Sequence, residues 1–145
     1  MRNEVEILLV EDNPDDAELA LHSFRRHKVA NSVHHARDGV EALDFVFCRG
    51  AHADRSIDDI PKVILLDLKL PLVDGIQVLR EIKADPRTRN IPVVALTSSR
   101  EDRDIQECYD LGVNSYIVKP VDFEQFTEAI RQLGLYWMVL NQRPA

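Results

Sequence analysis

Residues 63–71, VILLDLKLP, decide the fold of this chain. Four apolar residues run into the acidic Asp67, and Pro71 follows four positions later. An apolar run without polar alternation is typical of a central parallel strand whose two faces are both covered. The stretch therefore predicts a buried strand of an α/β sheet, with one carboxylate at its carboxyl end.

Three further apolar runs also stop at polar or charged residues. The carboxyl ends of parallel strands meet at one edge of a sheet, where open α/β folds keep their ligand sites. We therefore expect the residues that follow these runs to lie close to Asp67. The runs are 7–10 before Glu11 and Asp12, 93–96 before Thr97 and Ser98, and 116–118 before Lys119 and Pro120.

The composition is that of an ordinary globular domain. The chain has 145 residues, 45% hydrophobic and 30% charged, which is enough for one self-sufficient core. The formal net charge is −7 and no long block of consecutive basic residues is present, which argues against nucleic acid as a partner. No apolar signal segment opens the chain and no run approaches the roughly 18 apolar residues of a membrane span, so we expect a cytoplasmic protein.

Strand and helix patterns alternate along the chain, and they predict five βα units. Right-handed crossovers with helices on both faces favour a doubly wound parallel sheet of strand order 2-1-3-4-5. Asn13, Asp38 and Asp122 stand where they can cap the first, second and fifth helices. The predicted strands are 5–10, 32–36, 63–66, 91–96 and 115–118, and the buried stripe of the second helix is predicted as Val40, Leu43, Val46 and Phe47.

The cysteines and histidines show no zinc-site pattern. Cys48 and Cys108 stand singly in apolar stretches, so we expect buried small hydrophobes. His34 and His35 point to opposite faces of a strand, which disfavours a shared metal. We expect all the histidines on the surface or at the sheet edge; they are His22, His27, His34, His35 and His52.

Three carboxylates, from Glu11, Asp12 and Asp67, would crowd one sheet edge and repel each other. A hard divalent cation such as Mg²⁺ relieves that repulsion, because it takes oxygen ligands and is usually held by one or two carboxylates. We expect Asp12 and Asp67 to bind Mg²⁺ directly and Glu11 to act through water. Lys69 could offer its backbone carbonyl while its side chain points away.

With Mg²⁺ bound, one oxygen of Asp67 remains free to attack a phosphorus atom. Phosphoryl transfer needs positioning and charge neutralisation more than covalent help. Lys119 would supply a positive charge toward Asp67 and then toward its phosphate. The Thr97 hydroxyl can donate to a phosphoryl oxygen, and the small Ser98 leaves room for that group. The predicted catalytic residues are therefore Asp67, Thr97 and Lys119.

Together these motifs resemble the receiver domain of two-component response regulators. The matching features span about residues 5–133, with Glu11 standing where many members have aspartate. The resemblance implies a flavodoxin-like fold, Mg²⁺ dependence, and a phosphoaspartate formed with a sensor histidine kinase or a histidine phosphotransfer protein. The matching residues are Glu11, Asp12, Asp67 followed by Asp74 and Gly75, Thr97, and Lys119 before Pro120.

The resemblance also implies a conformational switch. In the family, the hydroxyl residue, here Thr97, moves toward the aspartyl phosphate, and the aromatic residue, here Tyr116, turns inward. The output surface would then be formed by the fourth helix, the fifth strand and the fifth helix, and the Lys119–Pro120 bond would be cis. The alternative for Tyr116 is a fixed, partly buried strand tyrosine.

The end of the chain resembles stand-alone receivers that serve bacterial phytochromes. After the core, about 5–133, residues 134–145 form an apolar tail that could support a homodimer or pack on its own domain. No DNA-binding or enzymatic domain follows, so we expect a single receiver domain, residues 1–145, that switches its partner-binding or dimerisation surface. The candidate dimer residues are Tyr136, Trp137, Met138 and Leu140.

Two other function classes compete with this interpretation. A phosphatase of the haloacid dehalogenase type places a second acid two residues after the nucleophile, where this chain has Lys69. A flavin carrier would want a Ser/Thr/Gly-rich phosphate loop after the first strand, where residues 11–14 read EDNP. We therefore expect a signalling protein that is not an enzyme and that catalyses only its own phosphorylation and dephosphorylation.

Overall fold

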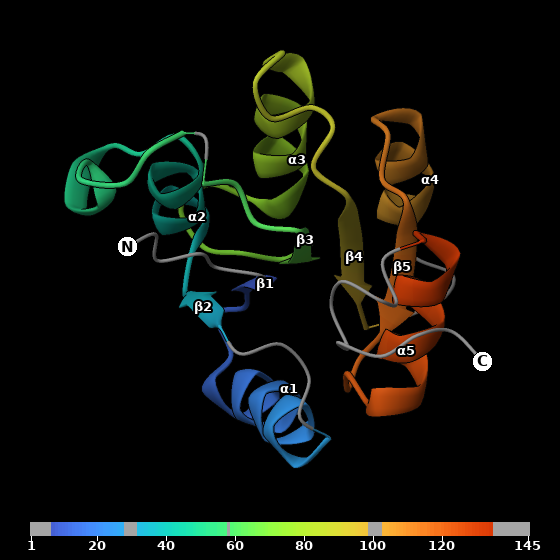
Figure 1. Ribbon diagram of the computed structural model, residues 1–145. Coiled ribbons are helices and arrows are strands. Elements are labelled where there is room, and N and C mark those ends of the chain that lie inside the picture. The colour runs from blue at the N-terminus through green and yellow to red at the C-terminus, as the bar shows by residue number, and fades with distance from the viewer. Residues whose placement is uncertain (1–6, 28–31, 58, 99–102, 135–145) are drawn as a thin grey trace.

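The computed structural model describes residues 7–27, 32–57, 59–98 and 103–134, and the dimer candidates of the tail lie outside this part. Strands and helices alternate through it (Figure 1). The strands are β1 (Ile7–Val10), β2 (Val33–Ala36), β3 (Val63–Asp67), β4 (Val93–Thr97) and β5 (Ser115–Val118). The helices are α1 (Pro14–Arg26), α2 (Gly39–Val46), the 3₁₀ turn η1 (Gly50–His52), α3 (Gly75–Ala84), α4 (Arg103–Asp110) and α5 (Phe123–Gln132).

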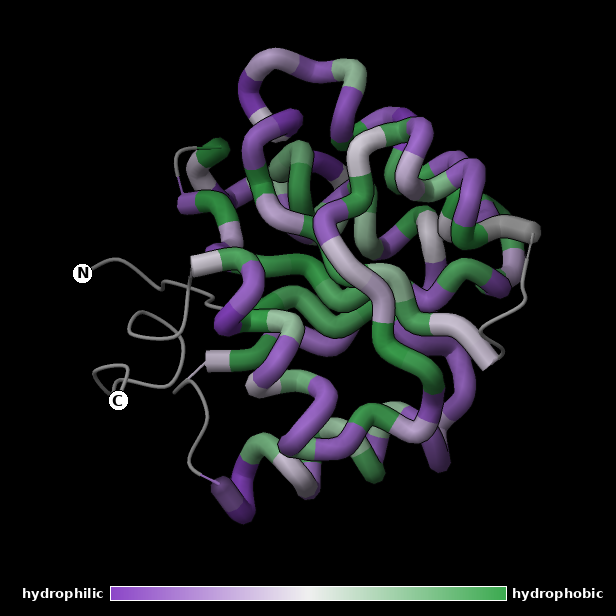
Figure 2. Tube along the Cα trace, turned by 90° about the vertical axis from the view of Figure 1, so that its right-hand side faces the viewer, coloured by the Kyte–Doolittle hydropathy of each residue, from purple (hydrophilic) through white to green (hydrophobic). Residues whose placement is uncertain are grey.

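The five strands form one parallel sheet in the order β2-β1-β3-β4-β5, which confirms the predicted topology. One core cluster joins the sheet to α2, α3 and α4, and a second joins the opposite face to α1 and α5. In Figure 2 the hydrophobic strands lie at the centre, between helices that contain both hydrophilic and hydrophobic residues. Every residue of β1 and β3 is buried, as expected for strands covered on both faces.

Side-chain caps start the helices at the predicted places. The Asn13 side chain accepts from the backbone N–H groups of Asp15 and Asp16, at 2.9 and 3.1 Å, and so fixes the first turn of α1 beside the end of β1. Asp38 and Asp122 accept from the backbone three residues on. The local sequence therefore determines where each helix leaves the sheet edge.

The predicted buried face of α2 was wrong at Val40, which is 41% exposed. Gly39 explains the difference, because a Cβ at this position would lie 1.9 Å from the carbonyl oxygen of Val73. That close approach turns Gly39 inward and rotates Val40 outward. Ala42 and Phe45 take buried positions instead.

A second close approach couples α3 to the end of β3. A Cβ on Gly75 would lie 2.3 Å from the carbonyl oxygen of Asp67, so only glycine allows α3 to start there. Asp74 caps this helix through the N–H of Ile76. The backbone from Asp67 to Leu68 is therefore packed directly against the start of α3.

The Lys119–Pro120 peptide bond and the two cysteines were also the subject of predictions. The Lys119–Pro120 peptide bond is cis, as the resemblance implied. Cys108 is buried as predicted, whereas Cys48 is only partly buried. Within the described ranges, none of the helices combines the length and the apolarity that crossing a membrane requires.

Candidate functional site

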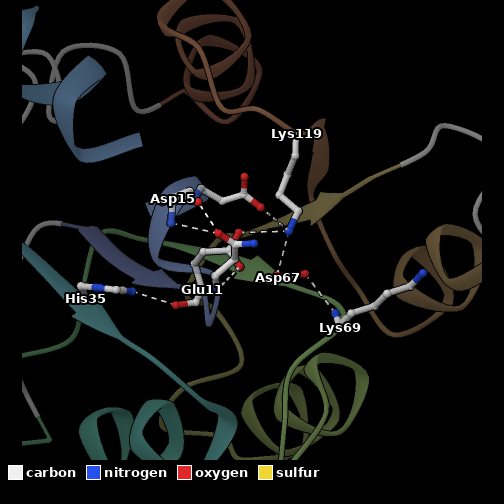
Figure 3. A network of polar contacts seen from close by, with 8 residues as sticks. Glu11, Asp15, His35, Asp67, Lys69 and Lys119 are labelled. Atoms are coloured by element: carbon white, nitrogen blue, oxygen red, sulfur yellow. Dashed lines mark hydrogen bonds and ion pairs between the residues drawn. The ribbon is translucent and has the colours of Figure 1, made fainter. Parts of the chain in front are cut away.

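The polar residues that follow the strands meet at the carboxyl edge of the sheet, as predicted (Figure 3). Glu11 directly follows β1, Asp67 and Thr97 end β3 and β4, and Lys119 directly follows β5. Asp67, Thr97 and Lys119 line a cavity of about 160 Å³. It is lined by Asp12, Asn13, Asp16, Asp67, Leu68, Lys69, Leu96, Thr97, Ser98 and Lys119.

Asp67 is held from two sides. Only 3% of the residue is exposed, and its Oδ1 accepts a hydrogen bond from the backbone N–H of Lys69 at 3.0 Å. Its Oδ2 accepts from Lys119 Nζ at 2.9 Å. In Figure 3 the Lys69 side chain extends away from the carboxylates, so Lys69 contacts Asp67 through its backbone. These contacts fix the orientation of a buried carboxylate that lines the cavity.

Lys119 is the shared positive charge of the site. Besides Asp67, its Nζ contacts Glu11 Oε1 at 3.1 Å and Asp16 Oδ2 at 3.3 Å. Burial alone lowers the pKa of Lys119, but the hydrogen bonds and charges of Asp67 and Glu11 outweigh it and raise that pKa above its ordinary value. Lys119 therefore remains protonated throughout the physiological range.

The role of Asp16 was missed from the sequence, which indicated only an acid in the first turn of a helix. The structure places this carboxylate against Lys119. The available signal was its position, because the first turn of a helix that follows a strand directly also lies at the carboxyl edge of the sheet.

Glu11 is the most strongly perturbed acid of the site. The residue is 1% exposed, its Oε2 accepts from the N–H of Asn13 at 3.3 Å, and its carbonyl oxygen lies 2.8 Å from the ring nitrogen Nε2 of His35. Burial, followed by the hydrogen bond and negative charge of Asp67, raises the pKa of Glu11 to about 8, and Lys119 only partly opposes this. At neutral pH Glu11 therefore keeps its proton in the metal-free protein, because the carboxylates that meet here exceed the positive charge of one lysine.

That excess charge fits a divalent cation. Carboxylate oxygens of Glu11, Asp12 and Asp67 lie within 4.8 Å of one another, and the exposed Asp12 opens the cluster to solvent. An all-oxygen donor set with one accessible side is what a hard cation such as Mg²⁺ takes, with water completing its coordination. The arrangement can hold such an ion beside Asp67.

Thr97 and Ser98 form the wall of the cavity beside Asp67. Thr97 is 2% exposed, and its carbonyl oxygen accepts from the N–H of Lys119 at 2.7 Å, which continues the pairing of β4 with β5 past Val118. Ser98 is exposed at the mouth. A threonine hydroxyl and a lysine ammonium thus share the cavity with one carboxylate.

Tyr116 lies away from this cavity, on the face formed by α4, β5 and α5. It is half-buried and meets Tyr109 edge-on, with ring centroids 6.4 Å apart. Both rings line a groove of about 560 Å³ that continues between β5 and α5. This placement fits either a fixed strand tyrosine or a ring that moves, so both interpretations of Tyr116 stay predictions.

The pKa of Glu11 predicts how stability depends on pH in metal-free protein. Folding raises the pKa of the Glu11 carboxyl from its ordinary value of 4.5 to about 8, so the folded state binds this proton more tightly than the unfolded state. The stability that Glu11 contributes is therefore complete below pH 4.5 and is lost as the pH rises toward 8. We expect the free energy of unfolding to fall across this window by at most about 1.4 kcal/mol per pH unit from this group. Urea titrations in EDTA measure this slope, and Glu11→Gln should flatten it. Equal slopes in the two proteins would contradict the assignment.

The chain is similar to known proteins in both sequence and structure. Residues 7–131 match the family model described as response regulator receiver domain. The bacteriophytochrome response regulator AtBRR has a structure that superposes with a TM-score of 0.86 at 50% identity, covering 97% of this chain and 100% of that one.

Two cyanobacterial relatives are also similar. Response regulator Rcp1 of Synechocystis sp. is 34% identical over 96% of this chain and 92% of its own length, and its structure in an Mn(2+)-bound form superposes with a TM-score of 0.75. The phosphorylated cyanobacterial phytochrome response regulator RcpA is 38% identical, with a TM-score of 0.76, over 98% of this chain and 99% of that one.

Proposed function

Because the chain belongs to the response regulator receiver domain family, we propose that it accepts a phosphoryl group on Asp67 from a phosphohistidine. Receiver domains of this kind are phosphorylated by histidine kinases, and they are signalling proteins. The observation that carries the choice of acceptor is the position of Asp67: a buried carboxylate that lines the cavity and accepts from Lys119 and from the Lys69 backbone, at 2.9 and 3.0 Å.

The chemistry follows from these contacts. An oxygen of Asp67 attacks phosphorus, an O–P bond forms, and the N–P bond to the donor imidazole breaks, with the electron pair leaving on the imidazole. Lys119 stabilises the carboxylate beforehand and the phosphoryl oxygens afterwards, and the Thr97 hydroxyl donates to one of those oxygens. Asp12, Asp67 and the Lys69 carbonyl would hold Mg²⁺, with Glu11 acting through water, and the bound ion would neutralise charge on the transferred group.

The switch and the partners belong to the same proposal. Thr97 would move toward the phosphate and Tyr116 would turn inward, which changes the groove between α4, β5 and α5. A sensor kinase related to bacterial phytochromes is the proposed donor, supported by the similarity to AtBRR and RcpA. We also propose that the protein acts in the cytoplasm as a single receiver domain and that it forms a homodimer.

The competing phosphatase is not supported. Membership of the receiver family accounts for Asp67 together with the residues at the other strand ends. The residue two positions after Asp67 is Lys69, and its side chain points away from the carboxylates (Figure 3). A nucleophile without a second acid at that position is suited to holding a phosphate for signalling.

Phosphoramidate with Mg²⁺ tests the proposal. Intact mass spectrometry should show a single phosphoryl adduct, stable in acid and lost in hydroxylamine. EDTA should prevent its formation. Multiple turnover of a broad panel of phosphate esters, without an accumulated adduct, would favour the phosphatase instead.

The metal ligands predict unequal effects on Mg²⁺ affinity. Asp12→Ala removes a directly binding carboxylate and should weaken Mg²⁺ binding at least about tenfold, the scale on which single groups around a metal act. Lys119→Ala removes a positive charge that repels the ion, so it should not weaken Mg²⁺ binding. Isothermal titration calorimetry at fixed pH measures both constants, and equal losses would mean that the metal lies elsewhere.

A further inference from the structure

A second group of ligand-type side chains lies at the opposite edge of the sheet from β5. His34 lies on the edge strand β2, Glu41 on the first turn of α2, and His52 on η1, which packs beside α2. One ligand atom from each, two ring nitrogens and a carboxylate oxygen, lie within 4.8 Å of one another. Sequence spacing does not reveal this group, because its members are seven and eleven residues apart on three elements.

Each side chain of the group is held in place. The His34 ring stacks on Phe45 with centroids 4.2 Å apart and planes at 9°, and the His52 ring meets His34 edge-on at 5.1 Å. The N–H of Arg37 donates to Glu41 Oε2 at 3.1 Å, which leaves Oε1 directed at His34. An outer contact that orients a carboxylate in this way is typical of the surroundings of metal ligands.

The contact between His34 and Glu41 has the spacing of two ligands of one ion. His34 Nε2 lies 3.5 Å from Glu41 Oε1, yet this buried nitrogen makes no hydrogen bond within the described part of the chain. Two atoms bound to a tetrahedral Zn²⁺ at about 2.0–2.1 Å would be about 3.3 Å apart. The 3.5 Å contact with Glu41 satisfies this buried nitrogen only weakly, and a bound cation would satisfy it fully.

Arg55 completes the surroundings of the group. Its guanidinium lies over the Phe45 ring, 3.6 Å from the centroid, and donates to the backbone oxygens of Phe45 and Asp59. Because the same Phe45 ring stacks on His34, this guanidinium helps to hold the surface on which the His34 imidazole packs.

We propose that His34, Glu41 and His52 form a site for a zinc-type transition cation, with water as the fourth ligand. Two imidazoles and one carboxylate suit Zn²⁺ and not Mg²⁺, which prefers oxygen ligands, so this site is chemically distinct from the carboxylate cluster at Asp67. Occupancy would tie η1 to the edge strand β2 and to α2.

Zinc titration in excess Mg²⁺ tests the proposal, because Mg²⁺ then occupies the carboxylate cluster. Wild-type protein should bind one equivalent of Zn²⁺ by calorimetry, and the ring resonances of His34 and His52 should shift together by NMR. His52→Ala and Glu41→Gln should each weaken the affinity at least about tenfold. His22→Ala, at an exposed position of α1, is the matched control and should bind zinc like wild type.

The test leaves His34 unchanged, because its ring packs on Phe45 and its loss could perturb α2. The variants His52→Ala and Glu41→Gln avoid this effect on folding. Circular dichroism should be unchanged in His52→Ala and Glu41→Gln. Absence of zinc binding by wild type in excess Mg²⁺ would overturn the proposal. Wild-type affinity in both variants, or an equal loss in His22→Ala, would overturn it as well.

Discussion

Asp67→Asn is expected to abolish phosphoryl incorporation, lowering the initial rate with phosphoramidate and Mg²⁺ by at least about 10³-fold, the scale on which loss of a nucleophile acts. The amide has nearly the shape of the carboxylate but no anionic oxygen to attack phosphorus. It also contributes one less charged ligand to a cation. Intact mass spectrometry over a time course measures the rate directly.

The same substitution should leave the fold intact, which makes the loss of labelling interpretable. The carbonyl oxygen of the introduced amide could still accept from the Lys69 N–H, and removing one charge relieves repulsion with Glu11. Asp54→Asn, the same chemical change at an exposed loop position, is the matched control and should label at the wild-type rate. Retention of the adduct in the Asp67 variant would move the acceptor to another residue.

The fold could be predicted because its determinants are local and periodic. Apolar runs such as 63–66 define buried parallel strands, and caps such as Asn13 and Asp38 start the helices that follow. With right-handed crossovers, only a few strand orders remain. Val40 was misplaced because the rotation of α2 is set by contact between Gly39 and the distant Val73, which periodicity does not contain.

The candidate site was predictable for a related reason. Residues that end parallel strands must meet, so the proximity of Glu11, Asp67 and Lys119 follows from strand order alone. Asp16 and the group around His34 were not predicted, because they depend on how a helix or a loop turns its side chains toward another element. Such contacts have no fixed sequence spacing.

Lys119→Ala should have the largest effect on stability among the substitutions at the carboxylate cluster. Lys119 Nζ contacts three carboxylates, and its side chain is only 16% exposed. Removing one partner of a buried ion pair leaves the other charge uncompensated, which costs about 3–5 kcal/mol where both are fully buried. Because Asp16 is partly exposed and Glu11 can take up a proton, we expect about 2–3 kcal/mol in metal-free protein at pH 8.

The dependence of this loss on pH and Mg²⁺ separates charge from packing. Below pH 4.5 Glu11 is protonated in both the folded and the unfolded state, so less charge is left uncompensated and the loss should shrink. Saturating Mg²⁺ should reduce it at pH 8, since the cation replaces the missing positive charge. The Lys69 side chain points away from the cluster, so Lys69→Ala should change the free energy of unfolding little under any of these conditions. A loss for Lys119→Ala that is the same at both pH values and with or without Mg²⁺ would identify Lys119 as a packing residue, and the electrostatic account of the site would then be wrong.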